Sequence, residues 1–353
     1  MTLAVRYTAA RALDTAPAET RSPGPGEVEL APAYVGICGT DLHIFHGDMD
    51  ARVRMPAVLG HEMSGRVLRV GGGVDGWQPG DAVTVMPLRW DDTCPACLQG
   101  HQHICQHLDF IGIDSPGAMQ QRWIVPASTL VRLPETLPLD RAALVEPTAV
   151  AVHDVGRAQV TEGEKVVVVG GGPVGILIAL VARAAGAEVR VVELSAHRRL
   201  LAEELGLTAW NPADVDVPAL VGQWTGNAGA DVAFEVSGAA GGVETAVDVL
   251  GVRGRLCLVA IHPRPREVNL HRFFWRELTL VGARLYDRYD FERAVALVAD
   301  GTIPAERLIS KVVPLTQAPA AFEALEGGGD VMKILVDCTD TTSTTDDTQG
   351  VTV

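Results

Sequence analysis

The stretch Val35–Gly65 reads V-G-I-C-G-T-D-L-H at its start and L-G-H-E-M-S-G at its end. It combines two borderline-soft metal ligands, Cys38 and His61, with one hard ligand, Glu62. A lone Cys is usually a small buried hydrophobe, and a lone His more often forms hydrogen bonds than binds a metal. Here glycines favour tight turns in which side chains converge: Gly36, Gly39, Gly60 and Gly65. Because a catalytic zinc keeps one coordination position open, ligands from separate loops indicate a catalytic zinc site.

The composition is that of a globular protein. The chain has 353 residues, of which 47% are hydrophobic and 21% charged, enough for about two domains. A net charge of -15 argues against nucleic acid and anionic membranes as partners. The uncharged run Val166–Ala182 contains G-G-G-P and is better explained as strand, turn and helix than as a membrane span. No secretory signal opens the chain, so the cytoplasm is the expected location.

A second metal-binding pattern lies in D-D-T-C-P-A-C-L-Q-G-H-Q-H-I-C, residues Asp91–Cys105. A C-x-x-C pair closes a tight turn, and a third cysteine follows eight residues later. Since zinc accepts carboxylate oxygen, the predicted ligands of a structural zinc are Asp91, Cys94, Cys97 and Cys105. Alternative fourth ligands are Asp92, His101 and His103, and the lobe could also have lost its metal.

A dinucleotide-binding pattern begins at Lys165. A buried strand over Lys165–Val169 is followed by G-G-G-P-V-G, a helical run from Ile176, and a second strand over Glu188–Val192. In this context the G-x-G-x-x-G motif predicts a pyrophosphate on the helix N-terminus. Glu193 would bind the adenosine ribose hydroxyls and repel a 2′-phosphate, which favours NAD over NADP, although the nearby arginines weaken that preference. The predicted cofactor-binding residues are Gly170, Gly172, Pro173, Val174, Gly175, Glu193 and Arg198.

The motif G-H-E-M-S-G followed by Gly71 resembles the signature of zinc-containing medium-chain alcohol and polyol dehydrogenases. C-G-T-D-L-H, residues Cys38–His43, resembles the first ligand loop of that family, and x2, x2, x7 from Asp91 matches the spacing of its four-cysteine lobe. Glu146, in A-L-V-E-P-T-A-V-A-V-H, stands where the polyol branch has a zinc-site glutamate. The resemblance covers the chain to about Val336.

The resemblance implies an α/β protein with two domains. A discontinuous, mostly-β, GroES-like catalytic domain is expected over residues 1–155 and 286–338, and a doubly wound parallel Rossmann domain that binds NAD over 156–285. A helix over Asp140–Val155 connects them, and a disordered tail follows at 339–353. The apolar run Leu278–Gly282 is expected to be an edge strand through which subunits pair as a homodimer or homotetramer.

The resemblance also implies the chemistry, which is oxidation of a secondary alcohol, vicinal diol or polyol by zinc and NAD. Whether Glu62 or Glu146 completes the catalytic zinc site is left open. Thr40 is expected to take the substrate proton and His43 to pass it to solvent, with Glu62 also at the catalytic centre. The residues expected to shape the substrate pocket are Phe45, Phe110 and Tyr286.

The substrate class rests on the run V-A-I-H-P-R-P-R-E-V-N-L, residues Val259–Leu270, which is similar to the 2,3-butanediol dehydrogenase branch. Sorbitol, idonate and L-threonine dehydrogenases are alternatives. A zinc-free, quinone-reductase-like enzyme and a non-catalytic protein on the same fold are alternatives of a different class. The three intact ligands and the intact nucleotide turn argue against both.

Overall fold

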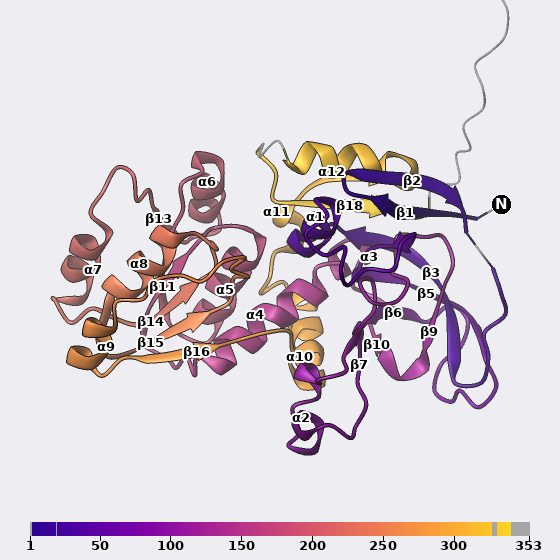
Figure 1. Cartoon of the computed structure of the whole chain (residues 1–353), viewed down its shortest axis with the longest axis horizontal. Helices are drawn as coiled ribbons and strands as arrows, with labels where there is room; N and C mark the ends of the chain where they lie inside the picture. Colours follow the sequence, from indigo (N-terminus) through magenta and orange to yellow (C-terminus); the bar gives the residue numbers. More distant parts are fainter. Residues whose placement is uncertain (1, 19, 327–329, 340–353) are drawn as a thin grey trace, which may run out of the picture.

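The computed structural model describes residues 2–18, 20–326 and 330–339. Two domains lie side by side, and helices α4 (Val145–Arg157) and α10 (Arg288–Ala299) pack against each other between them (Figure 1). All of the predicted tail except Thr339 falls outside the described residues. Within the described residues no helix is both long enough and apolar enough to span a membrane.

The mostly-β domain, which the sequence predicts to be the catalytic domain, is built on a sheet with β3 (Glu27–Gly36) near its centre. Its strand order is β10-β6-β5-β3-β18-β17, and β9 also pairs with β3. The C-terminal strands β17 (Ile309–Pro314) and β18 (Lys333–Asp337) run parallel, and β18 pairs antiparallel with β3. Two distant parts of the chain therefore share one sheet. The other members are β5 (Glu62–Val70), β6 (Ala82–Val85), β9 (Trp123–Pro126) and β10 (Leu130–Arg132).

Smaller elements surround this sheet. Strands β2 (Ala12–Pro17), β1 (Leu3–Ala9) and β4 (Ala57–Val58) form a separate three-stranded sheet, and β7 (Leu88–Arg89) pairs with β8 (Asp109–Phe110). The helices of this domain are α1 (Gly39–Phe45), α2 (Pro95–Leu98), α3 (Leu139–Ala142), α11 (Ala305–Leu308) and α12 (Ala318–Glu326).

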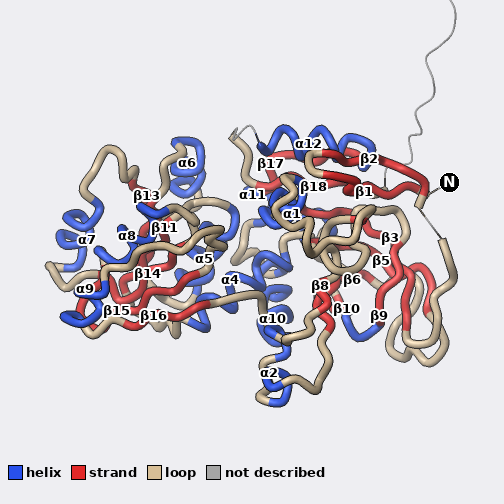
Figure 2. The backbone as a smooth tube through the Cα atoms, in the orientation of Figure 1, coloured by secondary structure: helices blue, strands red, loops and turns tan. Residues whose placement is uncertain are grey.

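The second domain is a six-stranded sheet in the order β13-β12-β11-β14-β15-β16, with every neighbouring pair parallel. Helices lie on both faces of this sheet (Figure 2). The central strand β11 (Lys165–Val169) reads K-V-V-V-V and its valines are buried, because parallel strands are covered on both faces. The remaining strands are β12 (Glu188–Val192), β13 (Thr208–Trp210), β14 (Ala230–Glu235), β15 (Leu250–Leu258) and β16 (Thr279–Gly282).

The connection between the domains differs from the predicted single helix over Asp140–Val155. The structure has α3 and then a separate α4, which begins at Val145. Pro147 explains the break, because proline lacks an N–H and clashes with the preceding turn unless it lies in the first turn of a helix. The break places Glu146 in the first turn of α4, which packs against α5 (Pro173–Ala184).

The outer edge of the parallel sheet is apolar and exposed. Strand β16 is the terminal strand of the sheet, as predicted, and Leu280 on it is 46% exposed. Helix α9 (Leu270–Arg276), which directly precedes β16, exposes Leu270, Phe274 and Trp275. The other helices of this domain are α6 (Ala196–Glu204), α7 (Val217–Thr225) and α8 (Ala240–Asp248).

Candidate active site

The three predicted ligands of the opening stretch come together. Cys38 caps the N-terminus of α1, whereas His61 and Glu62 lie at the start of β5. One ligand atom from each lies within 4.8 Å of the other two. His61 is 2% and Glu62 1% exposed. A thiol, an imidazole and a carboxylate from two separate loops are therefore held inside the catalytic domain.

His61 carries a buried nitrogen that has no partner. Its Nδ1 forms no hydrogen bond, and the nearest carboxylate oxygen, Oδ1 of Asp41, lies 3.6 Å away and is also unpaired. The other Asp41 oxygen accepts a bond from the Cys38 amide at 2.9 Å. Burial opposes charging of His61, but Asp41 and the Cys38 thiol hold its pKa well above its usual value. The Nδ1 atom therefore faces Asp41, and the thiol, imidazole and carboxylate within 4.8 Å of one another fit a zinc ligand set.

Glu62 forms a buried ion pair that the sequence reasoning missed. The Lys333 ammonium on β18 donates to both Glu62 oxygens, at 2.8 and 2.6 Å, and to the Ile37 carbonyl at 3.2 Å. Both side chains are at most 4% exposed. Burial lowers the pKa of Lys333, but Glu62 outweighs it and raises the pKa above its ordinary value. A single lysine in the apolar run V-M-K-I-L-V was the sequence signal for a buried cation.

Glu146 is the second buried carboxylate beside the ligands. It is 4% exposed, and its Oε1 accepts a hydrogen bond from the Tyr286 hydroxyl at 2.6 Å. Burial raises the pKa of Glu146 to about 7, since His61 only partly offsets the cost of desolvating its charge. Tyr286, predicted to line the pocket, is fully buried against Glu146. The choice of carboxylate ligand therefore lies between Glu62, shared with a lysine, and Glu146, bonded to a phenol.

The other predicted site residues differ in how near they lie to the metal ligands. Thr40 lies in the first turn of α1 and is half-buried, close in sequence to Cys38. The Nδ1 of His43 lies 3.1 Å from Asp48, and its side chain is 43% exposed. The Phe110 ring packs edge-on against His61, with centroids 5.1 Å apart. Phe45 is instead 2% exposed and packs against Phe322 of α12, in the hydrophobic core.

The cysteine lobe also has its predicted ligands together. Ligand atoms of Asp91, Cys94, Cys97 and Cys105 all lie within 4.8 Å of one another. One Asp91 oxygen accepts bonds from the Thr93 and Cys94 amides, and the other lies 2.5 Å from Nδ1 of His107. The bond to His107 is the main reason why the pKa of Asp91 is lowered. His107 was not predicted; it orients the carboxylate, as outer partners of metal ligands do.

The nucleotide turn has the geometry that the motif requires. Gly170 has a φ of 109°, and a Cβ at Gly175 would overlap the Gly170 carbonyl oxygen. Helix α5 begins at Pro173, so its free N–H groups face the turn. Glu193 follows β12 and accepts bonds from the amides of Gly171 and Ser195, both at 2.7 Å. The Arg198 guanidinium lies 3.9 Å from Glu193.

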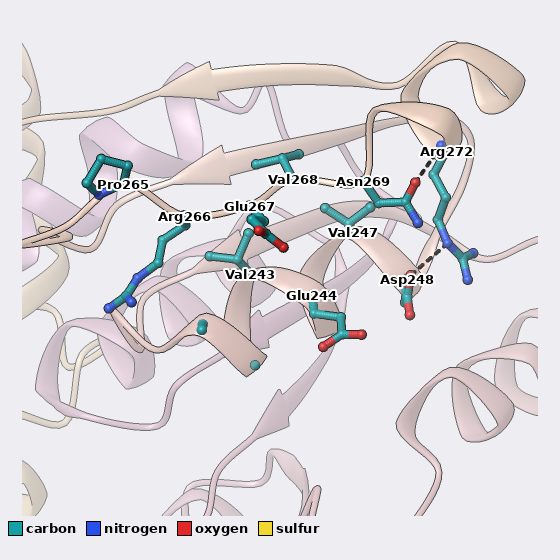
Figure 3. Close-up of a pocket in the computed structure, with 12 residues that line it drawn as sticks. Val243, Glu244, Val247, Asp248, Pro265, Arg266, Glu267, Val268, Asn269 and Arg272 are labelled. Atoms are coloured by element: carbon teal, nitrogen blue, oxygen red, sulfur yellow. Dashed lines mark hydrogen bonds and ion pairs between the residues drawn. The ribbon is translucent and has the colours of Figure 1, made fainter.

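A pocket of about 730 Å³ lies elsewhere in this domain, between α8 and the segment that leads into α9 (Figure 3). Its wall includes Asp248, whose carboxylate pairs with Arg272 at 2.7 Å. Its lining includes none of the predicted metal ligands and no residue of the nucleotide turn. We therefore do not assign the chemistry to it.

The buried ion pair gives a testable prediction for stability. Lys333→Met leaves Glu62 buried without its cation, which should lower the free energy of unfolding of the metal-free protein by about 3–5 kcal/mol. The double variant Glu62→Gln/Lys333→Met should recover most of that loss, because neither charge remains. Urea unfolding of the three proteins measures the effect. A single variant within about 1 kcal/mol of wild type would contradict the buried pair.

The cysteine lobe gives a prediction for metal content. Cys97→Ser removes one thiolate, so zinc should fall from about two ions per chain to about one while most activity is kept. Metal analysis of protein never exposed to chelator is the measurement. Asp91→Ala should also weaken binding of the second zinc, since the carboxylate is the predicted fourth ligand. One zinc per chain in the wild type would show that the lobe binds none.

Two family models match the chain. The alcohol dehydrogenase GroES-like domain matches residues 24–135, and the zinc-binding dehydrogenase domain matches residues 173–300. These ranges fall on the mostly-β domain with the ligand trio and on the parallel sheet with the nucleotide turn.

Named relatives and solved structures agree with the models. A 2-dehydro-3-deoxy-L-galactonate 5-dehydrogenase from Pseudoalteromonas atlantica is 48% identical over 95% of this chain and 98% of its own. The crystal structure of 2R,3R-butanediol dehydrogenase from Bacillus subtilis is 31% identical, with a TM-score of 0.88 over 96% of this chain and 99% of that one. A zinc-binding dehydrogenase from Sinorhizobium meliloti bound to NADP has 31% identity and a TM-score of 0.90, with the same coverage.

The ligand trio, the glycine turn, the two domain matches and relatives aligned along almost their whole length lead to one conclusion. The chain belongs to the zinc-containing medium-chain alcohol and polyol dehydrogenases, enzymes that use zinc and a nicotinamide dinucleotide.

Proposed function

We propose that this protein transfers a hydride between a secondary hydroxyl carbon of a polyhydroxylated chain and NAD. The observation that carries the proposal is the convergence of Cys38, His61 and Glu62 in a buried site, in a chain that also holds a dinucleotide turn. Cys38, His61 and a carboxylate would hold a zinc that would polarise the hydroxyl oxygen, and NAD on the nucleotide turn would accept the hydride. The products are a ketone, NADH and one proton.

The residues of α1 provide a path for that proton. Thr40 follows the ligand Cys38 by two residues, and its hydroxyl can accept a proton while donating its own. His43, one helical turn further on, is partly exposed and bonded to Asp48, so it contacts both the protein and solvent. An imidazole with access to water suits a relay near neutral pH.

Our first candidate substrate is a sugar acid, from the name of one relative. The relative with 48% identity acts, by its name, on 2-dehydro-3-deoxy-L-galactonate, which is a hydroxylated keto acid. 2,3-Butanediol is the second candidate, supported by the sequence run Val259–Leu270 and by the Bacillus subtilis structure at 31% identity. We put the sugar acid first because this relative has the higher identity, 48% over 95% of the chain.

Loss of a ligand should remove turnover and leave cofactor binding intact. Cys38→Ser and His61→Ala should each lower kcat by at least about 1,000-fold, whereas the Kd for NAD should stay within about 2-fold, because the nucleotide turn lies in the other domain. Absorbance of NADH and fluorescence titration with NAD measure the two effects. A zinc-depleted Cys38→Ser protein with wild-type rates would overturn the mechanism.

NAD should be preferred to NADP. The Glu193 carboxylate, held by two backbone amides, would meet a 2′-phosphate as a like charge, worth a few kcal/mol in discrimination. Glu193→Ser should therefore shift the ratio of kcat/KM toward NADP by about 10-fold or more, with Arg198 left to bind the phosphate. Steady-state kinetics with both cofactors decide the point. Equal kcat/KM values in the wild type would show that Arg198 and Arg199 outweigh Glu193.

The protein should also form a homo-oligomer in a reducing compartment such as the cytoplasm, where its metal-binding thiols stay reduced. The edge strand β16 and the neighbouring helix α9 both expose apolar side chains, Leu280 on the strand and Phe274 and Trp275 on the helix, that a second copy can cover. Light scattering at micromolar concentration should give a dimer or tetramer mass, and Trp275→Glu should lower it. A monomer mass for the wild type would contradict the expectation.

A further inference from the structure

Three polar side chains form a hydrogen-bonded chain at the carboxyl edge of the parallel sheet. Glu235 ends β14 and is 0% exposed, and its Oε2 lies 2.9 Å from Nε2 of His262. Arg266 donates from Nε to Nδ1 of His262 and from Nη2 to the Gly238 carbonyl, both at 3.3 Å. These bonds connect the end of β14 to the segment that follows β15.

The partners of His262 determine where its ring hydrogen lies. A guanidinium can only donate, so Nδ1 of His262 accepts the bond from Arg266, and Nε2 carries the hydrogen and donates to Glu235. The other Glu235 oxygen accepts from the amides of Ser237 and Gly238, at 2.9 and 3.0 Å, and from the Ser237 hydroxyl. Both oxygens of the buried carboxylate are therefore bonded, and the direction of each bond is fixed.

Glu235 holds the following segment through its main chain as well. Residues 259–269 follow β15 and contain no helix or strand. The Glu235 carbonyl accepts bonds from the amides of Val259 and Ala260, at 3.0 and 3.1 Å. Further along, His262 and Arg266 add their side-chain bonds. An irregular segment is thus held in place at several points by the end of one strand.

The loop after β14 lies directly against the nucleotide turn. Val169, the last residue before the turn, pairs in register with Glu235, and its carbonyl accepts a bond from the Val236 amide at 2.9 Å. A Cβ on Gly170 would lie 2.9 Å from the Ser237 nitrogen, closer than Cβ atoms normally approach. Glu235 and Ser237 are therefore adjacent to the backbone that the pyrophosphate of the cofactor is expected to approach.

The strand order indicates which half of the cofactor this chain faces. A dinucleotide lies across the carboxyl ends of a doubly wound sheet, with one nucleotide over each half of the sheet. In the order β13-β12-β11-β14-β15-β16, Glu193 follows β12 in the first half, whereas Glu235 and His262 follow β14 and β15 in the second. Because Glu193 is expected to bind the adenosine ribose, the second half faces the nicotinamide nucleotide.

We propose that His262, held between Glu235 and Arg266, is a positioning residue for the nicotinamide nucleotide of NAD. The inference rests on the proposed function, which supplies the cofactor. The hydrogen-bonded chain fixes residues 259–266 at the carboxyl edge before the cofactor arrives, so less ordering is needed when the nicotinamide half binds. The adenosine half lies over the other strands, and its binding should not depend on this chain.

The test compares the whole cofactor with its adenosine half. Fluorescence titration gives the Kd for NADH, and calorimetry gives the Kd for AMP, which carries the adenosine half alone. His262→Leu removes both hydrogen bonds and should raise the Kd for NADH at least about 10-fold, while the Kd for AMP stays within about 2-fold. His262→Gln should recover most of the NADH affinity, because its amide can donate to Glu235 and accept from Arg266.

Two arginines of the same segment provide a matched pair. Arg264 is exposed and forms no hydrogen bond or ion pair with any residue that the structure describes. Arg266→Gln should raise the Kd for NADH by about 3- to 10-fold, whereas Arg264→Gln should leave it unchanged. Since Arg266→Gln keeps the bond between His262 and Glu235, this comparison tests the proposal even if His262→Leu does not fold.

Three results would overturn the proposal. Unchanged NADH affinity in a folded His262→Leu variant would show that His262 positions nothing. Equal weakening of NADH and AMP would show that the chain supports the nucleotide domain as a whole. A His262→Gln variant as weak as His262→Leu would show that the hydrogen bonds are not the cause. Neither ligand requires a substrate, so absence of turnover with these binding effects intact would reject the proposed function alone.

Discussion

Buried charge at the metal ligands is the constraint on which the rest of the site depends. The thiol of Cys38 and the carboxylates of Glu62 and Glu146 are crowded around one imidazole, and charges in a protein interior are costly unless they are paired. Lys333 neutralises Glu62, and the Tyr286 hydroxyl bonds Glu146. A divalent cation would compensate what remains. The site is therefore built to hold a metal and is strained electrostatically without one.

Lys333 also connects the two parts of the chain that form the catalytic domain. Lys333 lies on β18, which pairs with β3, so the C-terminal segment supplies the cation for a carboxylate near residue 60. On the other side, α4 carries Glu146 in its first turn and packs against α5, the helix that starts at the nucleotide turn. One helix thus links the metal ligands to the cofactor domain.

Sequence patterns predicted the features that depend on neighbouring residues, such as strand boundaries and the ligand loops. The strand boundaries Lys165–Val169 and Glu188–Val192 agree with the structure because valine-rich parallel strands end at glycine turns and polar residues. Cys38 and His61 could be found because glycines bracket reactive side chains.

Lys333 could not be paired with Glu62 from the sequence, since 271 residues separate them. The break before α4 was missed because Pro147 fits both the end of one helix and the first turn of the next. Phe45 was predicted to shape the substrate pocket, and that role stays a prediction, although its ring packs against Phe322 in the core.

The most direct test of the account is a crystal structure of the zinc-loaded protein with anomalous data on both sides of the zinc absorption edge. The account predicts an anomalous peak about 2.3 Å from the Cys38 sulfur and about 2.0–2.1 Å from a His61 nitrogen, with one carboxylate oxygen of Glu62 or Glu146 as a further ligand. Lys333 should remain bonded to Glu62, or shift from it only if Glu62 is the ligand. A zinc-loaded crystal with no peak between Cys38 and His61 would contradict the account.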